Sequence, residues 1–241
     1  MRPGRRRIVR AMTANQGQGR GAMKPLILAV PRGRIADEFR PLLERAGVAP
    51  EPAFDDPNSR LLRFKTNLPE LELIRVRSFD VAAFVGYGAA DFGVCGSDVL
   101  HESDDAEIYA PLDLGIGLCR LSVCKQASAD LPDPRRTGRV RIATKYPMTT
   151  RAYYVAQGVQ AECINLSGAM ELAPALKLAD RIVDLVATGS TLRANHLEET
   201  EVIAQVSSRL IVSRTAFKTA FVRLQPWIAH FESIVAAPER R

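Results

Sequence analysis

The alternation of short apolar runs with helix-like stretches is the feature that most constrains the fold of this chain. Residues 25–30 form a continuous apolar run, and Phe39, Leu42, Leu43 and Ala46 then follow at the spacing of one helix face. The same order of strand and helix continues along the sequence. Because this order is typical of α/β proteins in which strands pair in parallel, we predict an α/β fold with mainly parallel sheets.

Two long apolar strands indicate where the chain passes between two lobes. These strands are predicted over residues 114–124 and 201–213. We therefore expect two lobes joined by two hinge strands, as in periplasmic binding proteins. Lobe I comprises residues 24–115 plus 210–241, and lobe II comprises residues 116–209. In such folds the ligand binds in the crevice at the carboxyl ends of the strands.

Two prolines bear on the predicted helices. Because proline disrupts a helix interior, Pro41 predicts that the first helix begins near Asp37 or Glu38. Residues 215–235 carry apolar residues on one face, which predicts a final helix with a kink at Pro226.

The positive charge of the chain is concentrated at its start. The formal net charge is +6, and residues 1–22 hold six arginines and no acidic residue, so the rest of the chain is formally neutral. A neutral body argues against a nucleic-acid partner. Residues 1–22 also lack periodic apolar positions, so we predict a disordered basic tail, with the folded chain starting near Met23.

Other sequence signals predict a cytoplasmic protein that makes no membrane contact. The sequence has no apolar run of about 18 residues, the length that a membrane-spanning helix requires. The arginines at the start are not followed by the apolar stretch of a secretion signal. The four cysteines form no C-x-x-C pair and lie in apolar surroundings, so we expect reduced thiols and no zinc or redox site.

One strand-to-helix corner carries the strongest chemical signal. An apolar strand with Asp184 leads into Thr188, Gly189, Ser190 and Thr191, and a helix follows. The amide groups at a helix start attract a phosphate, the glycine allows close approach, and the hydroxyls donate further hydrogen bonds. Asp184 would hold ribose hydroxyls or a metal ion. An ordinary helix cap is the alternative, although one hydroxyl would suffice for it.

A pair of cations precedes the first predicted helix. Arg32, Gly33 and Arg34 lie between the first strand and that helix. Cations at a helix start are unfavourable unless an anion is also present, and the anion is either a ligand phosphate or the side chain of Asp37.

Two further arginines, Arg75 and Arg77, alternate at the end of a predicted strand and are expected on one face. Charges near buried strand ends require partners. A polyphosphate is one candidate, and ion pairs with Glu72 or Asp80 are the other.

The second lobe repeats such a corner at Lys145 and Tyr146, and Glu171 precedes another short helix, where it either caps the helix or faces the same ligand. No catalytic nucleophile or metal-ligand set is evident. The three histidines lie without carboxylate or cysteine partners at ligand spacing: His101, His196 and His230.

Together these motifs resemble the short form of the ATP phosphoribosyltransferase family. The run A-D-x-I-V-D-L-V-x-T-G-x-T-L, preceded by a Glu, is matched by residues 179–192 and Glu171. The other matches follow in family order: residues 31–34, 75–77, 91–93, 96–98 and 143–146. One departure is Lys177, where the family usually has glycine.

The resemblance implies a glycosyltransferase that carries out the first step of histidine biosynthesis. N1 of the ATP adenine attacks C1 of phosphoribosyl pyrophosphate, and pyrophosphate leaves. Mg²⁺, carried by the substrate, is the implied cofactor. By the same resemblance, one group of residues stabilises the charge of pyrophosphate and ATP: Arg32, Arg75 and Arg77. A second group binds substrate: Gly33, Lys145, Tyr146, Glu171, Asp180, Asp184, Thr188, Gly189, Ser190 and Thr191.

The resemblance also implies partners. Short-form members lack the C-terminal histidine-sensing domain and work with a regulatory subunit similar to histidyl-tRNA synthetase. We therefore expect a homodimer within a hetero-oligomer that histidine inhibits. A non-catalytic two-lobe module that binds small anions is the alternative. Other phosphoribosyltransferases commonly place two adjacent acids before the phosphate loop, whereas Leu185 follows Asp184 here.

Overall fold

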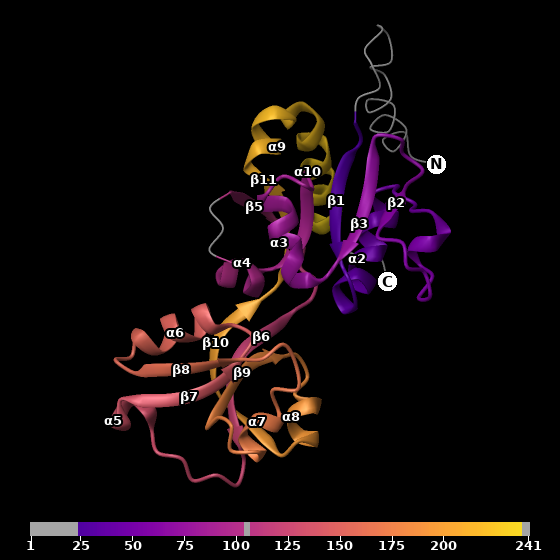
Figure 1. Ribbon diagram of the computed structural model, residues 1–241. Coiled ribbons are helices and arrows are strands. Elements are labelled where there is room, and N and C mark those ends of the chain that lie inside the picture. Colours follow the sequence, from indigo (N-terminus) through magenta and orange to yellow (C-terminus); the bar gives the residue numbers. More distant parts are fainter. Residues whose placement is uncertain (1–23, 104–106, 238–241) are drawn as a thin grey trace, which may run out of the picture.

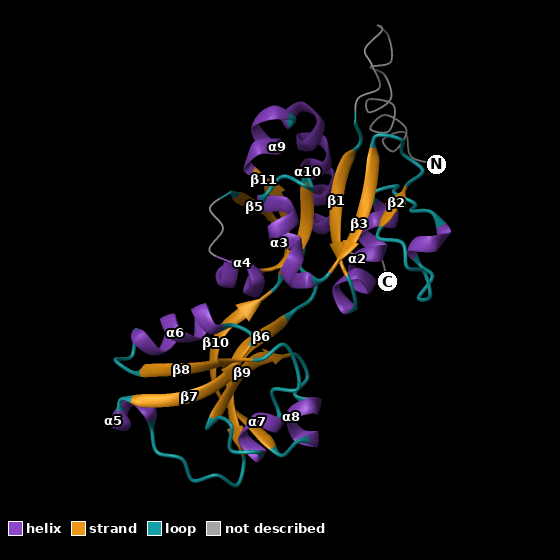
Figure 2. Cartoon of the chain, viewed as in Figure 1, coloured by secondary structure: helices purple, strands orange, loops and turns teal. Residues whose placement is uncertain are grey.

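A computed structural model describes residues 24–103 and 107–237 of the 241-residue chain. The predicted basic tail, residues 1–22, lies outside these described residues. Two lobes are visible, each built around one β-sheet with helices packed against it (Figure 1 and Figure 2). The predicted two-lobe α/β fold is therefore confirmed.

Lobe I is built around the larger sheet, in which six strands lie in the order β2-β3-β1-β4-β11-β5. β1 runs parallel to β3 and to β4, whereas β2, β11 and β5 run antiparallel to their neighbours. The strands of this sheet are β1 (Leu26–Pro31), β2 (Arg63–Lys65), β3 (Leu71–Val76), β4 (Phe92–Gly96), β5 (Ile108–Asp113) and β11 (Ser208–Ser213).

Lobe II is built around a sheet of five strands in the order β10-β6-β9-β7-β8. β7 runs parallel to β8 and to β9, whereas β6 runs antiparallel to β9 and to β10. The strands are β6 (Cys119–Gln126), β7 (Arg139–Thr144), β8 (Gln160–Asn165), β9 (Arg181–Val186) and β10 (Leu197–Val206).

Both sheets are mixed, so the prediction of mainly parallel sheets needs correction. The antiparallel neighbours include the strands that carry the chain between the lobes. β6 enters lobe II, β10 leaves it, and β11 inserts between β4 and β5 on the return. Because the chain enters lobe II along β6 and leaves it along β10, these two neighbouring strands run in opposite directions. The returning strand β11 likewise runs opposite to β4 in lobe I.

The two predicted hinge strands are each interrupted at the passage between lobes. The strand predicted over residues 114–124 begins only at Cys119, because Gly115 and Gly117 adopt left-handed conformations with φ of 66°. The strand predicted over residues 201–213 is divided at Ser207 into β10 and β11. The amide of Ser97 donates a 2.9 Å hydrogen bond to the Ser207 carbonyl, which fixes this break against lobe I.

Helices cover both faces of the lobe I sheet. Phe39 of α2 and Phe231 of α10 pack in one core, with ring centroids 5.6 Å apart. Val81 of α3 packs in a separate cluster on the opposite face. The helices of this lobe are α2 (Arg34–Arg45), η1 (Pro52–Phe54), α3 (Ser78–Gly86), α4 (Ser97–Ser103), α9 (Arg214–Thr219) and α10 (Phe221–Ala236). Those of lobe II are α5 (Pro134–Thr137), α6 (Pro147–Val155), α7 (Leu172–Ala175) and α8 (Ser190–Ala194).

The first and the last predicted helices differ in the structure in where they begin. α2 begins at Arg34 and contains Pro41, and the predicted final helix is divided at Ala220, with Pro226 inside α10. A proline in a helix leaves the carbonyl four residues earlier without its N–H partner. Those carbonyls belong to Asp37 and Val222, which are both exposed, so solvent is available to donate in place of the missing N–H groups.

The described part of the chain contains no helix that is long and apolar enough to cross a membrane. The four cysteines are free thiols, as expected. Cys95 and Cys124 are buried, and Cys119 and Cys163 are half-buried.

Candidate active site

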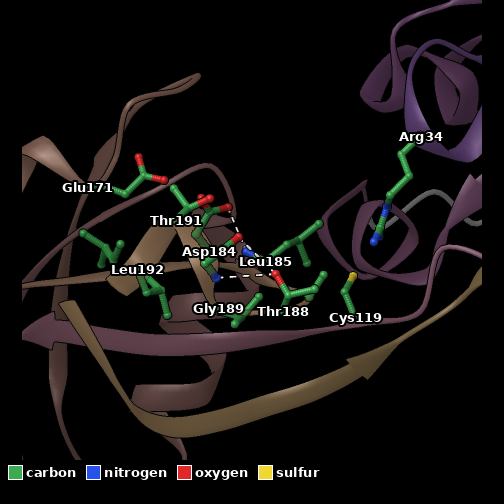
Figure 3. Close-up of a pocket in the computed structure, with 13 residues that line it drawn as sticks. Arg34, Cys119, Glu171, Asp184, Leu185, Thr188, Gly189, Thr191 and Leu192 are labelled. Carbon is green, nitrogen blue, oxygen red and sulfur yellow. Dashed lines mark hydrogen bonds between the residues drawn. The ribbon is translucent and has the colours of Figure 1, made fainter. Parts of the chain in front are cut away.

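A cavity of about 480 Å³ lies where β9 ends and α8 begins, in lobe II (Figure 3). Six of the residues predicted to bind substrate line this cavity: Glu171, Asp184, Thr188, Gly189, Ser190 and Thr191. Arg34 of α2 and Cys119 of β6 complete its wall. The cavity therefore draws on lobe I as well as lobe II.

The corner between β9 and α8 depends on Gly189. This residue is the N-cap of α8 and has φ of 71°, a conformation that favours glycine. Thr188 and Ser190 lie on either side, with their hydroxyl oxygens 3.0 Å apart. The amide of Ser190 lies 3.4 Å from the Thr188 hydroxyl, which is a long capping hydrogen bond. The first amides of α8 and these hydroxyls thus offer more hydrogen-bond donors than an ordinary cap needs, an arrangement that suits an anion.

Asp184 supplies a carboxylate to the same cavity. Burial raises the pKa of Asp184 to about 6, although a 2.8 Å hydrogen bond from the Leu185 amide opposes this rise. The nearby Glu171 carboxylate raises the pKa further, whereas the Lys145 ammonium lowers it. Because burial disfavours the charged form of this carboxylate, a ligand that supplies hydroxyl donors or a cation would stabilise it.

Lys145 and Tyr146 lie in a smaller cavity of about 160 Å³ between the two lobes. The Tyr146 hydroxyl donates a 2.9 Å hydrogen bond to the carboxylate of Asp98 in lobe I, and burial raises the Tyr146 pKa. The Lys145 ammonium lies 4.0 Å from the centroid of the Phe79 ring. These two residues therefore contact lobe I directly.

Arg32, Gly33 and Arg75 line a separate cavity of about 310 Å³ in lobe I. The Arg75 guanidinium lies over the rings of Phe54 and Phe64, at 5.6 and 4.9 Å from their centroids. It also donates a 2.8 Å hydrogen bond to the Phe54 carbonyl. Its Nε atom is buried and has no hydrogen-bond partner among the described residues.

Arg77 does not lie with Arg75. It follows the end of β3, is exposed, and lines neither the 480 Å³ cavity nor the 310 Å³ cavity. The ion pair considered between these arginines and Glu72 is absent from the described residues, because Glu72 pairs with Arg63 across the sheet.

Asp180 also lies apart from the cavity. It immediately precedes β9, whereas the cavity lies at the far end of that strand. Its carboxylate accepts hydrogen bonds of 3.1 Å from both the amide and the guanidinium of Arg141. Partial burial acts to raise the pKa of Asp180, but these hydrogen bonds outweigh it and lower the pKa. The structure thus gives Asp180 a role in joining β7 to β9.

Two residues of this region, Asp98 and Cys119, were not predicted from the sequence as site residues, and Arg34 was singled out only as one of the cations before the first helix. Arg34 faces the lobe II corner, ion-pairs with Glu38 and donates a 3.2 Å hydrogen bond to the Gly117 carbonyl. Cys119 lies beside it, and Asp98 is buried at the interlobe cavity. The sequence signal for Arg34 was its place two residues after Arg32 in the same loop.

No group of three or more His, Cys, Asp or Glu side chains that could hold a metal ion is present in the ranges 24–103 and 107–237. The carboxylates that line the larger cavity are those of Asp184 and Glu171.

The fold and this cavity together define a two-lobe α/β protein with a polar cavity at the end of a lobe II strand. The periplasmic aliphatic sulphonate binding protein SsuA of Escherichia coli shares the fold, with a TM-score of 0.55 and 12% identity over 89% of this chain and 74% of that chain. A family model for ATP phosphoribosyltransferase matches residues 77–233. The chain belongs to the ATP phosphoribosyltransferase family.

Individual relatives agree with this assignment. The ATP phosphoribosyltransferase of Paramagnetospirillum magneticum is 61% identical over 86% of this chain and 94% of its own length. That of Rhodospirillum rubrum is 58% identical over 86% of this chain and 91% of its own length. A solved complex described as HisG:HisZ ATP phosphoribosyl transferase, from Thermotoga maritima, has a TM-score of 0.74 and 28% identity, covering 87% of this chain and 98% of that chain. The resemblance found in the sequence is confirmed, and the family assignment favours the enzyme over the non-catalytic binding module.

Proposed function

We propose that the 480 Å³ cavity binds phosphoribosyl pyrophosphate and that ATP approaches it from the lobe I side. As a member of its family, the chain is a pentosyltransferase that carries out the ATP phosphoribosyltransferase reaction of histidine biosynthesis. The observation that carries the placement of substrate is the convergence of the Asp184 carboxylate and the Gly189 corner in one cavity.

The chemistry needs charge stabilisation more than acid or base catalysis. The adenine N1 has a free lone pair, which forms the bond to C1 of the ribose while the bond from C1 to the pyrophosphate oxygen breaks. Negative charge grows on the departing pyrophosphate, so cations placed at that oxygen lower the barrier. Mg²⁺ enters bound to the substrate and neutralises part of this charge.

Each wall of the cavity has a proposed role. The hydroxyls of Ser190 and Thr191, with the first amides of α8, bind the 5-phosphate, and Gly189 allows it to approach. The Asp184 carboxylate accepts hydrogen bonds from ribose hydroxyls, with Glu171 beside it. Arg34, on the opposite wall, faces the pyrophosphate.

The lobe I cavity is proposed to receive the ATP phosphates through Arg32 and Arg75. Its location beside the start of α2 brings ATP toward the same face as Arg34. Arg77, exposed beyond β3, is the least supported member of the charge-stabilising group. Lys145 and Tyr146 are proposed to border the reacting atoms from the interlobe cavity.

The activity is tested by mixing the full chain with Mg²⁺, ATP and phosphoribosyl pyrophosphate, with pyrophosphatase present, and detecting phosphoribosyl-ATP by mass spectrometry. Asp184→Asn is the site variant, and Asp180→Asn, at the residue that immediately precedes the same β-strand, is its matched control. We expect product from the wild type and the control, and strongly reduced product from Asp184→Asn. Equal product from all three would contradict the placement of the site.

We also propose a partner and a location. The related structure from Thermotoga maritima is a HisG:HisZ complex. By analogy, this chain forms a homodimer within a hetero-oligomer containing a regulatory subunit that resembles histidyl-tRNA synthetase and confers inhibition by histidine. The proposed location is the cytoplasm, where ATP is available. Light scattering of the mixed subunits, with inhibition assayed with and without the partner, tests the assembly, and histidine inhibition of this chain alone would contradict it.

A further inference from the structure

Helix α6 of lobe II lacks a side-chain cap of its own. Its N-cap residue is Tyr146, whose side chain makes no capping hydrogen bond. The first amides of a helix have no acceptor within the helix and require one from elsewhere. The acceptor comes from the other lobe.

Glu102 of α4, in lobe I, supplies this acceptor. One carboxylate oxygen accepts a 2.7 Å hydrogen bond from the Met148 amide. The other accepts hydrogen bonds of 2.9 Å from both the amide and the hydroxyl of Thr149. A carboxylate at a helix N-terminus is favourable both as a hydrogen-bond acceptor and because of the helix dipole. The first free amides of a lobe II helix therefore find their hydrogen-bond acceptor in lobe I.

The same face of α4 makes a second contact with lobe II. Asp98 lies four residues before Glu102 and accepts the 2.9 Å hydrogen bond from the buried Tyr146 hydroxyl. Phe79 of α3 adds a ring contact with Tyr146, with centroids 5.4 Å apart. α4 and α6 lie next to each other where the lobes meet (Figure 1). We refer to the hydrogen bonds of Asp98 and Glu102 with residues 146–149 as the α4–α6 contact.

We propose that the α4–α6 contact sets the angle between the lobes, and that Asp98 and Glu102 are positioning residues for the reaction. The contact holds residues 146–149, which directly follow Lys145. The ammonium charge of Lys145 acts on the Asp184 carboxylate and lowers its pKa. The contact also maintains the arrangement in which Arg34 of lobe I forms part of the wall of the lobe II cavity. The inference rests on the proposed function only in its last step, which links lobe angle to substrate affinity.

The contact is tested first on the full chain without substrate. Glu102→Ala removes the acceptor, Glu102→Gln retains one amide oxygen, and His101→Ala changes an exposed neighbour on the same helix. We expect hydrogen exchange of the Met148 and Thr149 amides to accelerate by about ten- to a hundredfold in Glu102→Ala, the range expected for loss of charge-assisted hydrogen bonds. The exchange rates in Glu102→Gln should lie between those of the wild type and Glu102→Ala, and the rates in His101→Ala should equal those of the wild type.

The effect on lobe angle and binding is tested with the same variants. Small-angle X-ray scattering should give a larger radius of gyration for Glu102→Ala than for the wild type. Calorimetry should show phosphoribosyl pyrophosphate binding weakened by roughly three- to tenfold, because the lobe arrangement that binds is less populated. Circular dichroism establishes that each variant is folded.

Three results would overturn the proposal: unchanged amide exchange, an unchanged radius of gyration, or unchanged or tighter binding in Glu102→Ala. If the wild type itself fails to bind phosphoribosyl pyrophosphate, the proposed function fails, and the exchange and scattering results still decide whether the contact sets the lobe angle.

Discussion

Replacing Asp184 with asparagine is expected to make the folded protein more stable while it removes function. The pKa of Asp184 rises from 3.8 in the unfolded chain to about 6 in the fold, chiefly because of burial. Between these two values the folded state binds more protons than the unfolded state. The free energy of unfolding therefore falls as the pH rises through this window, and above it the penalty for the buried charge is constant.

The size of this penalty follows from the shift. The change from 3.8 to about 6 corresponds to roughly 3 kcal/mol, since each pKa unit is worth about 1.4 kcal/mol. Asparagine carries no charge and retains the side-chain oxygen that accepts the 2.8 Å hydrogen bond from the Leu185 amide. We expect Asp184→Asn to be more stable than the wild type by up to about 3 kcal/mol at pH 8, and by about half as much at pH 5.

Urea unfolding followed by far-ultraviolet circular dichroism measures this difference at both pH values. Asp180→Asn is the matched control, because the pKa of Asp180 is lowered and the substitution breaks its pairing with Arg141. The stability that the Asp180 charge contributes is present above its unfolded pKa and is lost as the pH falls through its folded pKa. The control should therefore be less stable than the wild type at pH 8. An Asp184→Asn protein no more stable than the wild type at pH 8 would refute the reasoning.

Three further substitutions test other parts of the structure. Gly189→Val should weaken binding of phosphoribosyl pyrophosphate at least about tenfold, because φ is 71° and an added Cβ would lie 3.3 Å from Arg193 Nη1; calorimetry that finds wild-type affinity would contradict this. Lys177→Gly should raise the free energy of unfolding in urea by about 1 kcal/mol, because Lys177 has φ of 58° at the end of α7. A less stable variant would contradict this explanation. Arg34→Met should weaken binding of phosphoribosyl pyrophosphate. The urea midpoint should change little, because this side chain is half exposed, and unaltered affinity would show that Arg34 does not belong to the site.

The shape of the corner between β9 and α8 was predictable because all its signals are local in the sequence. The apolar strand, the glycine and the hydroxyls lie within residues 181–191, so the order of residues alone defines the corner. Asp180 belongs to the same run of sequence, yet it precedes the strand and pairs with Arg141. Four residues of strand separate Asp180 and Asp184 by about 13 Å, which is too far for both carboxylates to contact one phosphoribosyl ribose.

Features that depend on how separate elements meet were not predictable from one sequence. Arg75 and Arg77 alternate in the sequence, but β3 ends at Val76, so the alternation of faces no longer applies at Arg77. Arg75 is held by Phe54 and Phe64, which come from other segments. Arg75 therefore remains in the lobe I cavity rather than at the lobe II corner.

The interlobe contacts show the same limit. Asp98 and Tyr146 meet only because the two lobes adopt one relative angle, and nothing in the spacing of residues along the chain specifies that angle. The break in the predicted first hinge strand did carry a local signal. Gly115 and Gly117 flank one residue, and both adopt the left-handed conformation that ends a strand.

The discontinuity of lobe I determines the order in which the two lobes can form during synthesis. Lobe II is one continuous segment from β6 to β10, so its sheet is complete as soon as residue 206 has left the ribosome. Lobe I must wait for β11, which joins β5 to the rest of the sheet in the described part of the chain, and for the Phe231 ring that packs on Phe39. The half of the site that contains the corner between β9 and α8 therefore folds while the other half is still a nascent chain with an open sheet edge.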